Sequence, residues 1–284
     1  MTSSRWQSQI ADNLQSWDSV AGIHARGGGA AFYRVEEFLG GECRLSPWEY
    51  EELGDVTGKS LVHLQCHIGL DTLSWARRGA DVTGLDFSPQ AIHEAKLFAG
   101  KLGIQDAHFV VANLADAADV LEHDAFDIVY TGRGALCWLP DMNQWASVCS
   151  RLLKPGGVLY MEELHPVLSS VDVVSGDSDK ILQFVYNPFQ SEPFSEESSG
   201  TYADPDAETG LHINHSWEHS FADIINALIS QGFRLDLLNE REESFFAPWP
   251  ELMEPVSSHH WKLKPELVPI PMSYTLKATL GPVK

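Results

Sequence analysis

The chain has 284 residues and 44% hydrophobic content, enough for one large domain with a substantial core. Forty acidic residues against nineteen basic ones give a net charge of −21, which disfavours nucleic acids and anionic membrane surfaces as partners. Four cysteines without metal-ligand spacing, and no apolar run of membrane-spanning length, predict a globular protein of the reducing cytoplasm.

The first 57 residues are expected to form a helical segment over the core. Apolar residues recur every three or four positions from residue 5 to 23, which predicts a helix with an aromatic stripe that breaks at glycines 27–29. A second helix is expected over residues 32–39. The aromatic stripe either packs on the core or belongs to a lid over a ligand. The lid interpretation involves Trp17, His24 and Tyr33.

Residues 61–89, LVHLQCHIGLDTLSWARRGADVTGLDFSP, predict a strand, a helix and a second strand. The first strand, 61–64, stops at a glycine-containing turn, and a helix is expected over 71–78. The second strand, 81–85, ends at Asp86. A carboxylate roughly 20 residues beyond such a turn is positioned to accept hydrogen bonds from both hydroxyls of a ribose.

The glycine pattern of dinucleotide-binding turns is absent. Gln65 and His67 stand where two of the three glycines would be, and only Gly69 is kept. Because these side chains keep a pyrophosphate away from the backbone, the turn favours a nucleoside with an uncharged linkage.

Later segments continue the alternation of strands and helices that indicates a doubly wound sheet. Thr131, Gly132 and Arg133 follow the fourth strand, at the switch point where such sheets bind ligands. Glu162, Glu163 and His165 are expected to face the same crevice. The expected strands are 108–114, 126–130, 158–161, 233–240 and 273–280, and the expected helices begin at Ser88-Pro89, Met142 and Ser220.

Residues 167–219 interrupt this alternation and predict an inserted hairpin with a long loop. Alternation over 211–219 places His215, Trp217 and His219 on one side, as a substrate wall. A metal site formed by these histidines with His212 and His165 is disfavoured, because alternation sends His212 to the opposite face. No metal site is predicted.

Residues 61–89 resemble motifs I and II of the class I S-adenosylmethionine-dependent methyltransferases. FDIVYTGRGALCWLPD (126–141) and RLLKPGGVLYMEELHP (151–166) resemble the fourth and fifth strands of that family. His63 departs from the pattern, since the family usually has an acid there. The resemblance implies a Rossmann-like α/β sheet of seven strands, the last antiparallel. The expected parts are a helical lid (1–57), a cofactor-binding core (58–166), an inserted hairpin (167–219) and the rest of the core (220–284).

The resemblance implies S-adenosylmethionine as cofactor and a site along the carboxyl ends of the strands. Asn113 either accepts a hydrogen bond from the adenine amino group or caps the following turn. The expected cofactor-binding residues are Gln65, Cys66, His67, Gly69, Asp86, Phe87, Ser88, Asn113, Leu114, Thr131, Gly132 and Arg133, with Trp17, His24 and Tyr33 from the lid.

The expected reaction is methyl transfer to an oxygen or nitrogen of a small organic acceptor by a monomer or homodimer. A general base is needed only if the acceptor must lose a proton, and His165, followed by His215 and His219, is then the candidate. Two alternatives stay open: a nicotinamide-dependent reductase and a nucleoside-binding protein without chemistry.

Overall fold

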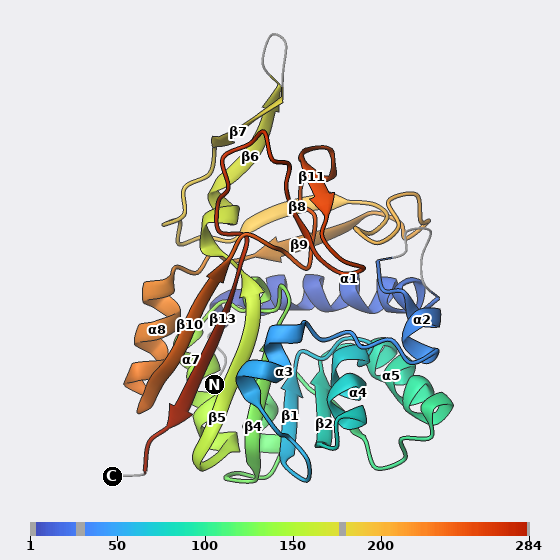
Figure 1. Ribbon diagram of the computed structural model, residues 1–284, viewed down its shortest axis with the longest axis vertical. Coiled ribbons are helices and arrows are strands. Elements are labelled where there is room, and N and C mark those ends of the chain that lie inside the picture. Colours follow the sequence, from blue (N-terminus) through green and yellow to red (C-terminus); the bar gives the residue numbers. More distant parts are fainter. Residues whose placement is uncertain (1–3, 27–31, 176–179, 283–284) are drawn as a thin grey trace.

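The computed structural model describes residues 4–26, 32–175 and 180–282. Its centre is a seven-stranded sheet in the order β10-β13-β5-β4-β1-β2-β3 (Figure 1). β13 is antiparallel to both neighbours and the other pairs are parallel, so the predicted seven-stranded doubly wound sheet is confirmed. The strands are β1 (Ser60–Leu64), β2 (Asp81–Asp86), β3 (His108–Val111), β4 (Phe126–Gly132), β5 (Leu153–Leu164), β10 (Phe233–Arg241) and β13 (Ser273–Leu280).

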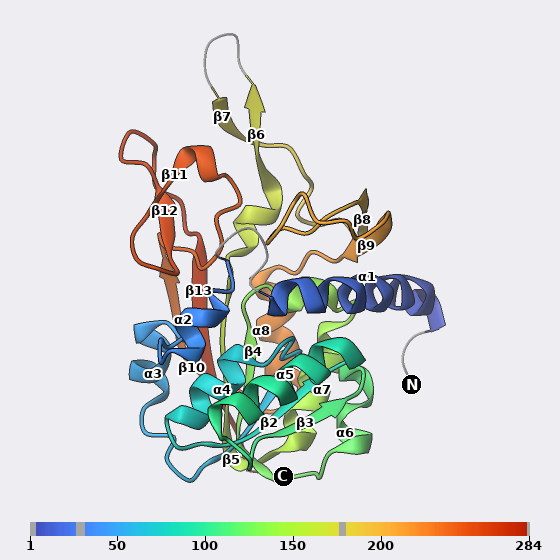
Figure 2. The same cartoon turned by 90° about the vertical axis from the view of Figure 1, so that its right-hand side faces the viewer.

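Helices cover both faces of the sheet (Figures 1 and 2). Strand β1 shows why: Val62 and Leu64 join the apolar cluster on one face, and Leu61 packs with Trp75 on the other. A strand buried on both faces needs an unbroken apolar run. One layer contains α3 (Pro47–Leu53), α4 (Leu70–Arg77) and α5 (Pro89–Leu102), and the other contains α6 (Ala117–Val120), α7 (Met142–Leu152) and α8 (Phe221–Ser230).

Helix α1 (Gln7–Ala25) crosses above the carboxyl ends of the parallel strands (Figure 1). Oδ1 of Asp18 attaches it to the start of α5, accepting from Ser88 Oγ at 2.6 Å and Gln90 N at 2.8 Å. The expected second helix is shorter, α2 (Val35–Leu39), and α3 was not predicted. The expected break at glycines 27–29 lies outside the described residues.

The insertion forms two hairpins in place of the single one expected. β6 (Val171–Ser175) pairs with β7 (Lys180–Phe184), and β8 (Phe194–Ser198) pairs with β9 (His212–Ser216). Each arm pairs with its near neighbour in sequence, and closing a short loop costs less conformational entropy than closing a long one. The first hairpin stands away from the sheet, whereas the second lies beside α1 (Figure 1).

Two core strands differ in length from their predictions. β3 ends three residues early because Asn113 caps the short helical turn Leu114–Asp116, and β5 extends over twelve residues. The segment between β10 and β13 adds a small ladder of β11 (Met253–Pro255) and β12 (Trp261–Leu263). Among the described residues, no helix has both the length and the apolar character of a membrane span.

Candidate functional site

A cavity of about 330 Å³ lies where β1, β2 and β4 end, below α1. The position matches the switch point of an open parallel sheet, where such folds bind ligands. Eleven residues expected at the cofactor site line it: Trp17, Tyr33, Gln65, Cys66, His67, Asp86, Phe87, Asn113, Leu114, Gly132 and Arg133.

The turn after β1 keeps a glycine-like backbone without the glycines. Gln65 has φ of 58° and His67 has φ of 47°, both in the left-handed region that favours glycine. At Gly69, with φ of 76°, an added Cβ would lie 2.8 Å from Cβ of Ala95, so a side chain has no room there. The turn therefore has a backbone of the kind that glycine favours, and it carries two polar side chains.

Asp86 at the end of β2 is fixed by two backbone donors. Its Oδ2 accepts from His67 N at 2.8 Å and its Oδ1 accepts from Ser88 N at 2.9 Å. Burial raises the pKa of Asp86 to about 6, although these donors oppose the shift. The carboxylate lines the cavity, where it can accept hydrogen bonds from a diol.

Asn113 lines the cavity and also caps a turn. Its Oδ1 accepts from Ala115 N at 2.9 Å, so the capping interpretation is confirmed. This hydrogen bond uses one lone pair of Oδ1, and the second lone pair can still accept. The contact of Asn113 with an adenine amino group stays a prediction.

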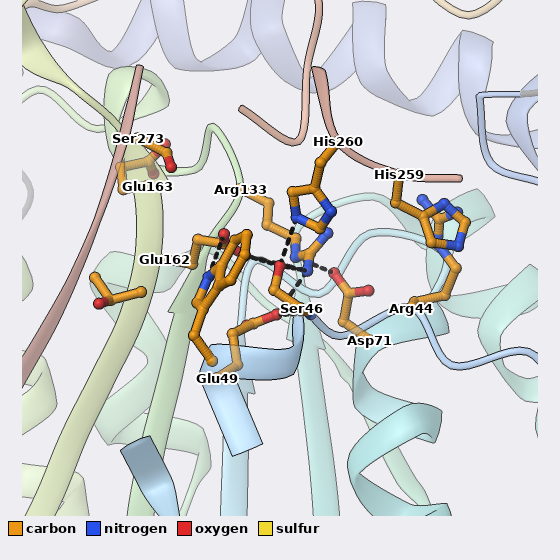
Figure 3. Close-up of polar contacts among 12 residues, drawn as sticks. Arg44, Ser46, Glu49, Asp71, Arg133, Glu162, Glu163, His259, His260 and Ser273 are labelled. Carbon is orange, nitrogen blue, oxygen red and sulfur yellow. Dashed lines mark hydrogen bonds and ion pairs between the residues drawn. The ribbon is translucent and has the colours of Figure 1, made fainter. Parts of the chain in front are cut away.

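Arg133, after β4, is clamped by carboxylates from three elements (Figure 3). Its Nη2 lies 2.6 Å from Glu49 Oε2 and 3.1 Å from Glu162 Oε2, and its Nε lies 3.6 Å from Asp71 Oδ2. Burial opposes the charge, but Glu49, Asp71 and Glu162 together raise the pKa of Arg133 well above its usual value. Burial and then Glu49 raise the pKa of Glu162 to about 8. This network fixes the far wall of the cavity.

Arg44 provides a second buried guanidinium at the cavity. It is 8% exposed, its Nη1 contacts Nδ1 of His259 at 2.8 Å, and its Nη2 donates weakly to the carbonyl of Phe32 at 3.4 Å. No carboxylate of the described residues lies within ion-pairing distance of Arg44. Burial lowers the pKa of Arg44 because the charge is desolvated. A buried cation without an ion pair is costly, so this position favours an anionic ligand group.

Gln65 and Asp71 add oxygen acceptors to the lining of the cavity that Arg44 also lines. Within the described chain, Oε1 of Gln65 is buried without a hydrogen-bond partner, while its Nε2 donates to Ala135 O at 3.0 Å. Asp71 is a carboxylate in the first turn of α4 and lines the cavity. These oxygens suit a cationic donor such as an ammonium group.

His63 stands where the family usually has its motif I acid. Its ring is neutral, and it contacts neighbouring side chains of the fold. Nδ1 of His63 contacts Oγ1 of Thr72 at 2.8 Å, and the ring packs edge-on against Tyr130. Burial lowers the pKa of His63 to about 3.

Several expected site residues lie behind the cavity wall. Ser88 caps α5, Gly69 shapes the turn, Thr131 is fully buried, and His24 contacts His67 from α1. The three candidate bases also lie outside the cavity lining. Nε2 of His165 contacts Glu240 at 2.7 Å, Nε2 of His215 contacts Asp12 at 3.2 Å, and His219 donates to Leu139 O at 2.7 Å.

Arg44 and several aromatic residues that line the cavity were not predicted from the sequence to belong to the site. Asp71 had a signal, because it lies within the quoted motif at the start of a helix. Arg44 precedes the core by 16 residues, and no local pattern distinguishes it. The aromatic residues that were not predicted at the site are Phe32, Trp138 and Tyr202. Phe245 and Phe246 belong to the proline- and aromatic-rich segment between the last two strands, which the sequence predicts as a pocket rim.

Comparison with known proteins shows similarity over the core of the chain. Residues 62–159 match the family model described as a methyltransferase domain. The chain is 35% identical over 115 residues to a ubiquinone biosynthesis O-methyltransferase of Alkalilimnicola ehrlichii, covering 40% of this chain and 44% of that protein. It is 32% identical over 125 residues to one of Xanthomonas oryzae pv. oryzae, covering 43% and 51%. The chain thus spans about half the length of the curated relatives it matches.

Solved structures extend the similarity of fold to most of the chain. A putative S-adenosylmethionine-dependent methyltransferase of Listeria monocytogenes aligns with a TM-score of 0.59 at 21% identity, covering 82% of this chain and 96% of that one. One of Mesorhizobium loti aligns with a TM-score of 0.57 at 22% identity, covering 85% and 99%. The resemblance is confirmed for the core and the fold: residues 62–159 match a methyltransferase domain, and most of the chain shares its fold with these two solved structures.

Proposed function

We propose that the protein transfers a methyl group from S-adenosylmethionine to an oxygen or nitrogen of a small organic molecule. The observation that carries the proposal is the pairing of two chemically different ends in one cavity. Asp86 suits a ribose at one end, while Arg44, with Asp71 and Oε1 of Gln65, suits the carboxylate and ammonium of an amino acid at the other. S-adenosylmethionine joins a nucleoside and an amino acid through a sulfonium sulfur, with no phosphate between them.

The same residues disfavour the nicotinamide reductase. A dinucleotide needs backbone donors for its pyrophosphate, and the side chains of Gln65 and His67 line the cavity at that turn. Asp71 adds negative charge beside the start of α4, where a pyrophosphate would need positive potential.

A second compartment favours an enzyme over a nucleoside-binding protein. Toward α1, the cavity continues between α1, the β8–β9 loop and the segment after β10. Its wall there consists of Phe32, Tyr202 and Phe246, together with Trp17 and Tyr33, two residues that were also expected to contact the cofactor. We call these five residues the aromatic compartment. Tyr202 is 44% exposed, so this side of the cavity reaches solvent and gives an acceptor a route of entry.

When bound, S-adenosylmethionine supplies a methyl group already activated on a sulfonium. The protein then has to hold the acceptor in line with the departing sulfur and exclude water, which lowers the barrier by several kcal/mol, of the order of effective-molarity effects. The candidate bases His165, His215 and His219 lie outside the cavity lining, so we propose that the transfer does not depend on them.

Calorimetric titration with S-adenosylmethionine, S-adenosylhomocysteine and NADH tests the proposal. We expect binding of the first two and none of NADH. Binding of NADH alone would favour the reductase, and adenosine binding as tightly as S-adenosylhomocysteine would remove the amino-acid site from the proposal.

We also propose a cytoplasmic monomer or homodimer. The support for the cytoplasm is that Cys43, Cys66, Cys137 and Cys149 are all free thiols. Light scattering of the purified protein measures the oligomeric state directly.

A further inference from the structure

A chain of three side chains runs from the β8–β9 loop into the cavity. Oγ1 of Thr201 lies 2.8 Å from Nε2 of His24, and Nδ1 of His24 lies 2.8 Å from Nε2 of His67. His67 lines the cavity, whereas Thr201 and His24 do not. Among the described residues none bonds Nδ1 of His67, so this nitrogen is the one that a ligand can meet.

The direction of these hydrogen bonds follows from Thr201. Its Oγ1 accepts from Ala203 N at 2.9 Å, and it shares the N–H of Asp204, at 3.3 Å, with the backbone carbonyl of Thr201, at 3.1 Å. A hydroxyl oxygen has two lone pairs and one hydrogen, so the remaining capacity of Thr201 is to donate. Thr201 therefore donates to Nε2 of His24.

The hydrogen bond between the two imidazoles runs in the same direction, from His24 as donor to His67 as acceptor. Burial lowers the pKa of His24 to about 4 and the pKa of His67 well below 6.5, so both rings are neutral at pH 7. A neutral ring that accepts at one nitrogen carries its proton on the other. His24 accepts at Nε2 and donates from Nδ1, so His67 accepts at Nε2 and holds its hydrogen on Nδ1.

The aromatic compartment surrounds this donor. The ring of His67 lies 5.2 Å from that of Trp17 and 5.6 Å from that of Tyr33, centroid to centroid. The hydroxyls of Tyr33 and Tyr202 bond to each other, which uses one of their two hydrogens and leaves the other to donate. The polar groups of this compartment are the indole N–H of Trp17 and the paired hydroxyls of Tyr33 and Tyr202. Like the N–H of His67, they can donate to a ligand oxygen.

We propose that Thr201 and His24 are positioning residues that fix His67 as an N–H donor, and that the aromatic compartment takes a flat aromatic acceptor whose reacting oxygen is anionic. The proposal rests on the proposed methyl transfer. The oxyanion supplies the electron pair of the new O–CH₃ bond, and the pair of the broken S–C bond returns to sulfur. No proton has to be removed. A carboxylate and a phenolate share this chemistry.

The tautomer is measured first, without any acceptor. In protein labelled with ¹⁵N-histidine, long-range ¹H–¹⁵N spectra distinguish a protonated ring nitrogen from a bare one. We expect Nδ1 of both His24 and His67 to be protonated, with the pattern retained in Thr201→Ser and lost in Thr201→Val. A proton on Nε2 of His67 in the unmodified protein would overturn the relay.

Ligand choice is measured next, by calorimetry on protein saturated with S-adenosylhomocysteine. Benzoate is compared with benzamide, and 4-nitrophenol at a pH where it is ionised is compared with 4-nitroanisole. We expect at least one anion to bind about tenfold or more tightly than its neutral partner, and which one does so separates the carboxylate from the phenolate. If neither anion has an advantage, the oxyanion proposal is wrong.

Variants of Thr201 test whether the tautomer of His67 determines the preference for an anionic ligand. Thr201→Val should reduce the preference for the anion severalfold, while Thr201→Ser keeps it. Thr209→Val is the matched control, because Thr209 also accepts a backbone N–H in this loop, from Gly200 at 2.8 Å, but is not part of the relay. Equal loss in Thr201→Val and Thr209→Val would mean a loosened loop and would overturn the relay. Failure to bind S-adenosylhomocysteine at the outset would instead refute the methyltransferase proposal.

Discussion

The backbone N–H of His67 donates to Oδ2 of Asp86 at 2.8 Å, which joins the turn after β1 to the end of β2. The residue that replaces a glycine of the turn therefore also orients the carboxylate expected to hold the ribose. Its side chain faces α1, where it meets His24. One residue thus connects the cofactor end of the cavity to helix α1.

Asp86→Ala should weaken the binding of S-adenosylhomocysteine by about 2 to 4 kcal/mol, because charge-assisted bonds to two hydroxyls are lost. Calorimetry provides the measurement. Asp81→Ala, at the exposed start of the same strand, is the matched control and should leave affinity unchanged. Equal affinity in Asp86→Ala and the unmodified protein would remove the ribose assignment.

Arg44→Gln should weaken the binding of S-adenosylhomocysteine by roughly tenfold to a hundredfold, the range of one charge-assisted contact. Binding of 5′-methylthioadenosine, which lacks the amino-acid end, should not change. This second ligand is the control for misfolding of the site. A parallel loss for both ligands would place Arg44 in the scaffold of the cavity and not at an amino-acid carboxylate.

Gln65→Gly combined with His67→Gly should not create binding of NADH. The substitutions relieve two left-handed non-glycine positions, each costing about 1 kcal/mol or more, but Asp71 still opposes a pyrophosphate. Fluorescence titration with NADH measures this. The single Gln65→Gly variant keeps the His67 contacts and serves for comparison. A gain of NADH binding would support a reductase origin.

His165→Asn should retain turnover within a few fold once an acceptor is known. Nδ1 of His165 accepts from Val167 N at 3.1 Å and Nε2 contacts Glu240, so both ring nitrogens are engaged away from the cavity. A drop of about a hundredfold with unchanged cofactor affinity would instead establish His165 as the base. His93→Asn, at an exposed position, controls for the loss of an imidazole.

His24 should make the fold sensitive to mild acid. Its pKa is about 4 in the folded protein and 6.5 in the unfolded chain, so the unfolded chain binds more protons between these values. The stability it contributes is complete above pH 6.5 and is lost as the pH falls toward 4, by about 2 kcal/mol at pH 5.

Denaturant unfolding of His24→Gln and the unmodified protein at pH 7 and pH 5 measures this contribution. The variant should lose less stability between the two pH values. Asp86 and Glu162, whose pKa values are raised, act in the opposite direction, so the difference between variant and unmodified protein is the informative quantity. His93→Gln should follow the unmodified protein; an equal pH dependence in His24→Gln would contradict the prediction.

Local sequence determined the core strands and helices and the position of Asp86, whereas the number of strands and the antiparallel last strand were expected from the family resemblance. Apolar runs bounded by glycine and proline specify strands and helices by short-range periodicity, and the acid lies in the same strand, helix and strand unit as the turn. The strands that flank the insertion were predicted for the same reason, and β13 begins and ends as expected.

Tertiary structure decided what the cavity can bind. Glu49, Asp71 and Arg133 meet only when α3, α4 and the end of β4 pack together, and Thr201 reaches His24 across 177 positions of sequence. Desolvation also depends on packing, so the neutral state of His24 and His67 could not be inferred from their identity. Hydrogen-bond direction and burial arise from long-range contacts, and these carry no local pattern in the chain.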